Sequence, residues 1–165
     1  MNISQIRKFD VANGPGVRTT FFVSGCTHYC KGCFNKETWD FNSGDPLTNE
    51  LADKIIEYAK SDKVVGVSIL GGEPFMQNKD IDMLYILSRL KFEVGKPIWV
   101  WTGYEFNELL KDNYAKVMLT YIDVLIDGRF EEDKKDLSLK YRGSTNQRVI
   151  DVKATVENKK IITIL

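Results

Sequence analysis

Three cysteines are the residues of this sequence best suited to chemistry. Cys26, Cys30 and Cys33 are separated by three and then two residues, and the chain has no other cysteine. An odd and tightly clustered set argues against a framework of structural disulfides. The pattern therefore predicts a metal or redox site.

Three thiolates are one ligand short of the usual metal sites of proteins. A structural zinc ion takes four Cys or His ligands, and His28, two residues after Cys26, is awkwardly placed to be the fourth. A cluster of four irons usually takes four thiolates, so three leave one iron open to an amine and carboxylate ligand. We predict a 4Fe–4S cluster that does chemistry rather than only storing electrons. For His28 itself, local hydrogen bonding is favoured over ligation or proton donation.

Other polar residues directly follow apolar runs. Gly71-Gly72-Glu73-Pro74 follows the apolar run 64–70, and its glycines permit close approach of the backbone to a ligand. The carboxylate of Glu73 is suited to accept a hydrogen bond from an ammonium group. The polar residues that follow two later apolar runs are Thr102, Asp127 and Arg129.

The elements that must position these residues alternate between strands and helices. Apolar and β-branched runs predict strands over 17–24, 64–70, 97–101 and 122–126. Helical periodicity predicts helices over 48–60 with Thr48 as N-cap, over 79–91, and over 105–121 with a break near Asn113. The alternation predicts right-handed βαβ units around a parallel sheet, with the polar residues on one rim.

The length of the chain limits how far such a barrel can close. A closed eight-unit barrel takes about 250 residues, so we predict a single α/β domain over residues 1–165 that forms a partial, open (β/α) barrel. The end of the chain differs from the rest. The runs Arg148–Ala154 and Lys159–Leu165, joined at Glu157-Asn158, predict a C-terminal β-hairpin extension over about residues 149–165.

The cysteine loop, with the aromatic Phe34 directly after Cys33, resembles the C-x3-C-x2-C signature of the radical S-adenosylmethionine superfamily. The resemblance implies a partial barrel of that superfamily's type and S-adenosylmethionine as second cofactor. It also implies that the backbone of Gly32, Cys33 and Phe34 passes close to the adenine.

The same resemblance implies cofactor contacts outside the cysteine loop. The Gly-Gly-Glu-Pro stretch is similar to one that binds the methionine amine in this superfamily. By their positions, Thr102 and Asp127 are implied as ribose or cation contacts. Arg129 is implied as partner of the methionine carboxylate, since a guanidinium suits bidentate carboxylate binding. The full implied set is Gly71, Gly72, Glu73, Thr102, Asp127 and Arg129.

Further stretches narrow the resemblance. Asn13-Gly14-Pro15-Gly16-Val17-Arg18 resembles the Gly-Pro-Gly-x-Arg stretch of glycyl-radical-enzyme activases. Three other segments resemble the activating proteins of anaerobic (class III) ribonucleotide reductases: Cys30–Asn35 with Thr38-Trp39, Ile98–Tyr104, and Tyr141–Gln147. The resemblance covers residues 2 to about 151, although Glu73 stands where many relatives have Asp.

This narrower resemblance implies a function and two partners. The function is reductive cleavage of S-adenosylmethionine at the cluster to a 5′-deoxyadenosyl radical, which creates a glycyl radical on the reductase. The implied partners are the catalytic subunit of the anaerobic reductase and an electron donor such as a flavodoxin-type protein.

Two other functions remain open. One is another radical enzyme, either the activase of a different glycyl radical enzyme or an enzyme that acts on a small molecule. The small-molecule enzyme would share the cluster but lack the activase-like stretches near Gly14 and Arg142. A non-catalytic iron–sulfur or zinc module would need a fourth ligand and would have no use for Glu73. The segment Arg142–Arg148 suits a solvated loop, a docking site for the reductase or a cover over the cofactor.

Composition argues against two classes of partner. The 23 basic and 23 acidic side chains give a net charge of zero, which does not indicate binding to nucleic acid or to an anionic membrane. No apolar run approaches the roughly 20 residues that span a bilayer, and the first residues lack the apolar core of a signal peptide. We therefore expect a cytoplasmic protein.

Overall fold

One open sheet organises the molecule. In the computed structural model, which describes residues 1–165, seven strands lie in the order β3-β1-β2-β4-β5-β6-β7. The parallel pairs are β2 with β4, β4 with β5 and β5 with β6, whereas β1, β3 and β7 pair antiparallel. The strands are β1 Asn2–Asp10, β2 Arg18–Val23, β3 Asp45–Pro46, β4 Gly66–Gly71, β5 Ile98–Trp101, β6 Val124–Asp127 and β7 Arg148–Asp151.

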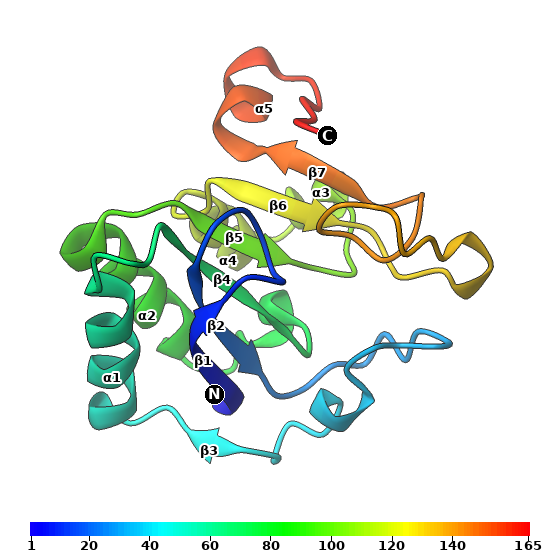
Figure 1. Cartoon of the computed structure of the whole chain (residues 1–165). Coiled ribbons are helices and arrows are strands. Elements are labelled where there is room, and N and C mark those ends of the chain that lie inside the picture. The colour runs from blue at the N-terminus through cyan, green and yellow to red at the C-terminus, as the bar shows by residue number, and fades with distance from the viewer.

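Helices connect the parallel strands and cover one face of the sheet (Figure 1). The helices are α1 Asn49–Lys60, α2 Asp82–Arg89, α3 Phe106–Leu109, α4 Asn113–Leu119 and α5 Val152–Asn158. Shorter turns of 3₁₀ helix cover Lys36–Thr38, Pro74–Met76 and Glu132–Lys134, and a π-helical turn covers Leu90–Val94. No helix has the length and apolar character needed to cross a membrane.

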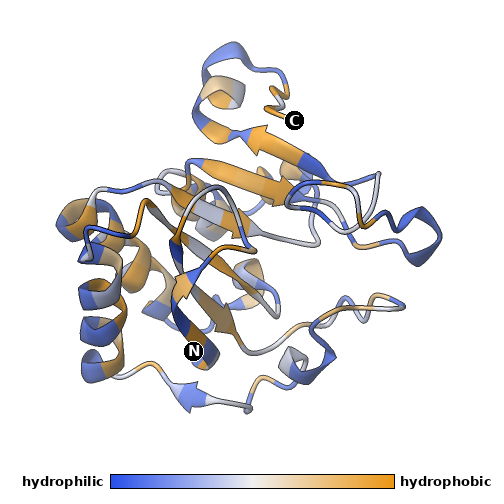
Figure 2. Ribbon diagram, in the orientation of Figure 1, coloured by the Kyte–Doolittle hydropathy of each residue, from blue (hydrophilic) through white to orange (hydrophobic).

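The main core lies between the sheet and these helices. Strand residues such as Phe21, Ile69 and Val100 pack there against helix residues such as Ile55 and Leu87, and all are buried. Figure 2 shows the apolar strands at the centre and the hydrophilic outer sides of α1 and α2. Because β4 is covered on both faces, its sequence is almost continuously apolar, as expected of a central parallel strand.

A smaller cluster lies on the opposite, concave face of the sheet. Trp99, Val124, Ile126 and Val149 form it, with Trp101 and Tyr141 packed against them. Since Trp101 also reaches the rim where the parallel strands end, this cluster forms part of the wall beside the candidate site.

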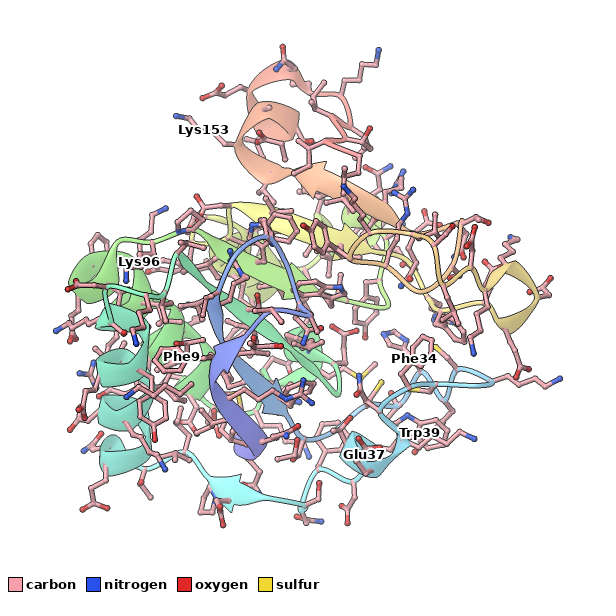
Figure 3. The ribbon with its side chains drawn as sticks, in the orientation of Figure 1. Phe9, Phe34, Glu37, Trp39, Lys96 and Lys153 are labelled. Atoms are coloured by element: carbon pink, nitrogen blue, oxygen red, sulfur yellow. The ribbon has the colours of Figure 1, made fainter.

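Local signals account for the helix boundaries. Thr48 caps α1 by accepting a hydrogen bond from the Leu51 amide, as predicted. Lys96, labelled in Figure 3, donates to the carbonyl oxygens of Ala59 and Ser61 at the other end of α1. The predicted break near Asn113 is confirmed, because Asp112 caps α4 through the Ala115 amide.

The four predicted strands are present, but the prediction missed β1 and β3. The sequence of β1, NISQIRKFD, is rich in polar residues because the strand lies near the sheet edge and is only partly buried. β3 is only two residues long and pairs only with the start of β1.

The predicted C-terminal β-hairpin is wrong. The segment after β7 forms α5, because Asp151 caps it through the Ala154 amide while Val152 and Thr155 are buried on one side. The last residues do return antiparallel to β7, through a single bridge between Ile150 and Thr163. The residues 152–158, which were predicted as part of a strand pair, therefore have their apolar side chains at helical spacing.

Candidate functional site

The carboxyl ends of the parallel strands surround one cavity of about 460 Å³. The predicted residues that line it are Cys26, Cys30, Cys33, Phe34, Gly71, Gly72, Glu73 and Thr102. Gly32, Asp127 and Arg129 are not among the lining residues. In Figure 1 the loop after β2 and the loop between β6 and β7 extend from the same side of the sheet, on either side of this region. The structure thus brings residues of the cysteine loop, the Gly-Gly-Glu-Pro turn and the end of β5 together.

The cysteine loop and the turn after β4 interlock through their backbones. The Gly72 amide donates to the Val23 carbonyl over 2.7 Å, and the Glu73 amide to the Gly25 carbonyl over 2.8 Å. A Cβ on Gly72 would lie 2.5 Å from the Gly25 oxygen, so only glycine permits this approach. Gly25 itself has φ +109°, a conformation that favours glycine. The positions of Cys26 and Glu73 are therefore fixed relative to one another.

Gln77 reinforces this connection, and the sequence analysis did not identify it. Its side chain is buried, and Nε2 donates to the carbonyl oxygens of Ser24, Gly25 and Glu73 at 3.0, 3.3 and 3.2 Å. The only signal in the sequence is a polar residue just after the Gly-Gly-Glu-Pro turn. Gln77 is therefore a positioning residue for both loops.

Glu73 is the most heavily hydrogen-bonded side chain of the cavity and is 1 % exposed. Oε1 accepts from the Thr102 hydroxyl at 2.8 Å and from the Phe75 amide at 3.0 Å. Oε2 accepts from the Gly103 amide at 2.7 Å and lies 2.9 Å from Nε2 of His28. The carboxylate thus ties the turn after β4 to the end of β5 and to the cysteine loop.

His28 has the local hydrogen bond that the sequence analysis favoured. Its ring packs edge to face on Tyr104, with 4.6 Å between centroids. A Cβ on Gly103 would lie 2.5 Å from the His28 ring, so the glycine makes room for the imidazole. With Glu73 ionised, the 2.9 Å contact is a hydrogen bond only if Nε2 carries the proton.

The three thiols are free and fit a cluster better than a single ion. No three His, Cys, Asp or Glu side chains converge closely enough to ligate one ion. A four-iron cluster does not need such convergence, because each thiolate binds a different iron. Burial raises the pKa of Cys26 to about 11 and also raises the pKa of Cys30. Iron binding must therefore displace protons from these thiols.

The loop between β6 and β7 packs onto the cysteine loop. The rings of Phe34 and Phe130 lie 4.9 Å apart between centroids, and a Cβ on Gly143 would come within 3.0 Å of both. Trp101 Nε1 donates to the Tyr141 carbonyl over 2.7 Å, which ties the loop to the end of β5. Figure 3 shows Phe34 on the side of the cysteine loop that faces this second loop. Part of the Arg142–Arg148 region thus covers one side of the cavity.

Asp127 and Arg129 do not line the cavity, whereas Thr102 does. Asp127 is fully buried and accepts from Arg148 Nε at 3.0 Å, from Arg148 Nη2 at 2.5 Å and from the Phe106 amide at 2.8 Å. Arg129 is exposed, although its charge acts on the Cys30 thiol in the direction that lowers its pKa. The cofactor contacts expected of the two residues remain predictions.

An open α/β sheet with a three-cysteine loop, a cavity and a buried carboxylate at one rim is the arrangement of an iron–sulfur protein. Residues 12–150 match a family model described as a 4Fe–4S single cluster domain. The sequence is 46 % identical over 153 residues to the anaerobic ribonucleoside-triphosphate reductase-activating protein of Escherichia coli K12, covering 90 % of this chain and 97 % of the relative. The chain belongs to the family of anaerobic ribonucleoside-triphosphate reductase-activating proteins.

More distant members support the same assignment. The protein of that name from Vibrio cholerae is 45 % identical over 150 residues, covering 89 % of this chain and 96 % of the relative. The one from Enterobacteria phage T4 is 36 % identical over 150 residues, covering 90 % and 93 %. The predicted family and the predicted 4Fe–4S cluster are thereby confirmed.

Proposed function

We propose that this chain activates an anaerobic ribonucleotide reductase by creating a radical on a glycine of that protein. The observation that carries the proposal is the gathering of Cys26, Cys30 and Cys33 with Glu73 around one cavity, in a chain of the activating-protein family. When bound, the 4Fe–4S cluster supplies the electron that cleaves S-adenosylmethionine to methionine and a 5′-deoxyadenosyl radical, the species that takes the glycine hydrogen.

The residues of the chain hold and orient these groups. Cys26, Cys30 and Cys33 would ligate the cluster and would leave one iron without a protein ligand, available to the amine and carboxylate of the methionine moiety. Glu73 receives the ammonium with Gly71 and Gly72, while the backbone of Gly32–Phe34 adjoins the adenine. Thr102, which lines the cavity, contacts the ribose or a cation.

Two further contacts belong to the proposal. Asp127 is proposed for the ribose or a cation and Arg129 for the methionine carboxylate. Asp127 already pairs with Arg148, and Arg129 lies outside the cavity lining. Both would act at the edge of the site rather than at its centre.

The fold is suited to a protein substrate. We assign the single domain to the partial barrel type of the radical S-adenosylmethionine superfamily, in which the unclosed sheet leaves room for a loop of the reductase. The contact between Phe34 and Phe130 joins the cysteine loop to the loop between β6 and β7 on one side of the cavity. The proposal includes a flavodoxin-type electron donor and a cytoplasmic location.

Anaerobic reconstitution tests the proposal. The chain is loaded with iron and sulfide, then given S-adenosylmethionine, a reductant and the cognate reductase. We expect 5′-deoxyadenosine and a glycyl radical signal in electron paramagnetic resonance. Absence of 5′-deoxyadenosine would refute the radical chemistry, and its formation without a glycyl radical would refute the assigned substrate.

A matched pair of variants tests the ligand assignment. Cys30→Ala should abolish both cluster binding and cofactor cleavage. Lys31→Ala, next to it in the chain with a side chain 90 % exposed, should retain both. Retention of the cluster in Cys30→Ala would contradict the assignment.

A further inference from the structure

We infer that His28 is a positioning residue that occupies the ammonium subsite of the cavity and gives up Glu73 when the cofactor binds. The inference rests on the proposed function, in which Glu73 receives the cofactor ammonium. It adds that the subsite is filled in the cofactor-free protein by a side chain of the cysteine loop.

The hydrogen-bonding capacity of Glu73 is the first step of the argument. A carboxylate has about four lone-pair positions. In Glu73 all are used, by the Thr102 hydroxyl, the amides of Phe75 and Gly103, and the His28 ring, at 2.7 to 3.0 Å. An ammonium group therefore gains a full hydrogen bond to this carboxylate only if one present donor leaves.

Three of the four donors are fixed. The amides of Phe75 and Gly103 belong to the backbone of the turn after β4 and of the segment after β5. The Thr102 hydroxyl accepts from the Tyr104 amide at 3.1 Å and is held in a side chain that is 5 % exposed, so its departure would strand a buried polar group. None of these groups can leave without disturbing the strand ends.

His28 differs from the other donors in two respects. It lies in the loop that carries the predicted cluster ligands, between Cys26 and Cys30, and not at a strand end. Its ring makes no hydrogen bond other than the one to Glu73 and is otherwise held by packing on Tyr104.

The His28 imidazole and the cofactor ammonium therefore compete for the carboxylate of Glu73. In the cofactor-free protein, His28 satisfies the buried charge of Glu73 and docks the cysteine loop against the ends of β4 and β5. When the cofactor binds, its ammonium replaces the imidazole, and the free energy needed to displace the imidazole lowers the affinity for the cofactor. Removing the Nε2 donor while keeping the ring volume should remove that cost.

Equilibrium binding to the cluster-loaded, oxidised protein tests this, because no cleavage occurs without reductant. His28→Phe keeps an aromatic ring against Tyr104 but has no donor, and His28→Leu is a second variant with the same expectation. Both should bind S-adenosylmethionine about fivefold to tenfold more tightly than the wild type. His28→Gln, which keeps an N–H donor, is the matched control and should bind like the wild type. Iron content and visible absorption confirm that each protein carries its cluster.

A second ligand separates displacement from a general change of structure. 5′-Methylthioadenosine has the adenosine and the thioether but no ammonium, so His28→Phe and His28→Leu should leave its affinity unchanged. Equal or weaker binding of S-adenosylmethionine by the donor-free variants would overturn the inference, as would a parallel gain for 5′-methylthioadenosine. If the wild type itself binds no S-adenosylmethionine, the proposed function fails and the inference with it.

Discussion

The Thr102 hydroxyl donates a 2.8 Å hydrogen bond to Oε1 of Glu73. It also accepts one from the Tyr104 amide at 3.1 Å, so its orientation is fixed from both sides. The two residues are 29 positions apart, and their contact joins the end of β5 to the turn after β4. The carboxylate is thus oriented from the end of β5.

Thr102→Val should therefore destabilise the protein and weaken the cofactor site together. The change leaves Oε1 of Glu73 with only the Phe75 amide as donor and takes the acceptor of the Tyr104 amide away, at a cost of about 2 kcal/mol in the free energy of unfolding. Urea unfolding measures this loss, and equilibrium binding measures the affinity for S-adenosylmethionine. Thr145→Val, at an exposed position, is the control and should change neither. A stability equal to that of the wild type would contradict the role of the hydroxyl.

The ion pair of Asp127 with Arg148 should stabilise the folded protein. Asp127 is fully buried, whereas the Arg148 side chain is 35 % exposed. Arg148→Gln should cost about 2 kcal/mol, less than the roughly 3–5 kcal/mol for breaking a fully buried pair, because water reaches the arginine side. Unfolding measurements on Arg148→Gln, Asp127→Asn and the double variant give the coupling energy. A double variant as unstable as the sum of the two single variants would show that the pair does not act as a unit.

Residues whose chemistry depends on their immediate neighbours in sequence were predictable. The cysteine loop, Glu73 and Thr102 each follow a strand directly, and parallel strands bring such residues to one rim. Contacts set by tertiary register were not predictable. The sequence does not indicate that His28 meets Glu73, 45 positions away, or that Gln77 reaches back to Ser24.

The strands and helices were likewise predictable only in part. Strongly apolar strands such as β4 and β5 were recognised because they are buried on both faces. The strand β1, which lies next to the two-residue edge strand β3, was missed because a partly exposed strand keeps many polar residues. In α5 the capping contact of Asp151 outweighs the strand-like composition of the residues around it.

Gly72 offers a test of the interlocked loops. Gly72→Ala would place a Cβ 2.5 Å from the Gly25 carbonyl oxygen, and a backbone atom cannot turn aside as a side chain can. The turn after β4 and the cysteine loop must then separate, so we expect loss of most of the bound iron after reconstitution. Gly95→Ala is the control, since it has a positive φ of 69° but its nearest atom lies at 3.9 Å. Gly95→Ala should lower the free energy of unfolding by about 1 kcal/mol and still load iron fully. Equal iron loading in the two variants would contradict the conclusion that the close contact between the two loops holds the cluster site together.

Arg18 and Arg89 should contribute very differently to the free energy of unfolding. Its side chain is buried without a carboxylate partner and donates to the Ser68 hydroxyl at 2.7 Å and to the carbonyl oxygens of Val67 and Pro97 at 2.9 and 3.0 Å. Burial lowers its pKa to about 10. A Cβ on Gly14 would lie 2.7 Å from Arg18, so the Gly-Pro-Gly-x-Arg stretch leaves room for this side chain, whose guanidinium lies over the Trp99 ring.

Arg18→Met should thus lower the free energy of unfolding by roughly 3 kcal/mol, because three strong hydrogen bonds at the amino ends of β2, β4 and β5 are lost together. Arg89 also makes several hydrogen bonds, to Glu93 and Asp53, but both partners are exposed. Arg89→Met should cost at most about 1 kcal/mol, as surface ion pairs do. Urea unfolding of both variants measures the difference. Since Arg18 lies at the opposite end of the strands from the cysteines, folded Arg18→Met should still load iron, and a loss of iron with intact stability would contradict this placement.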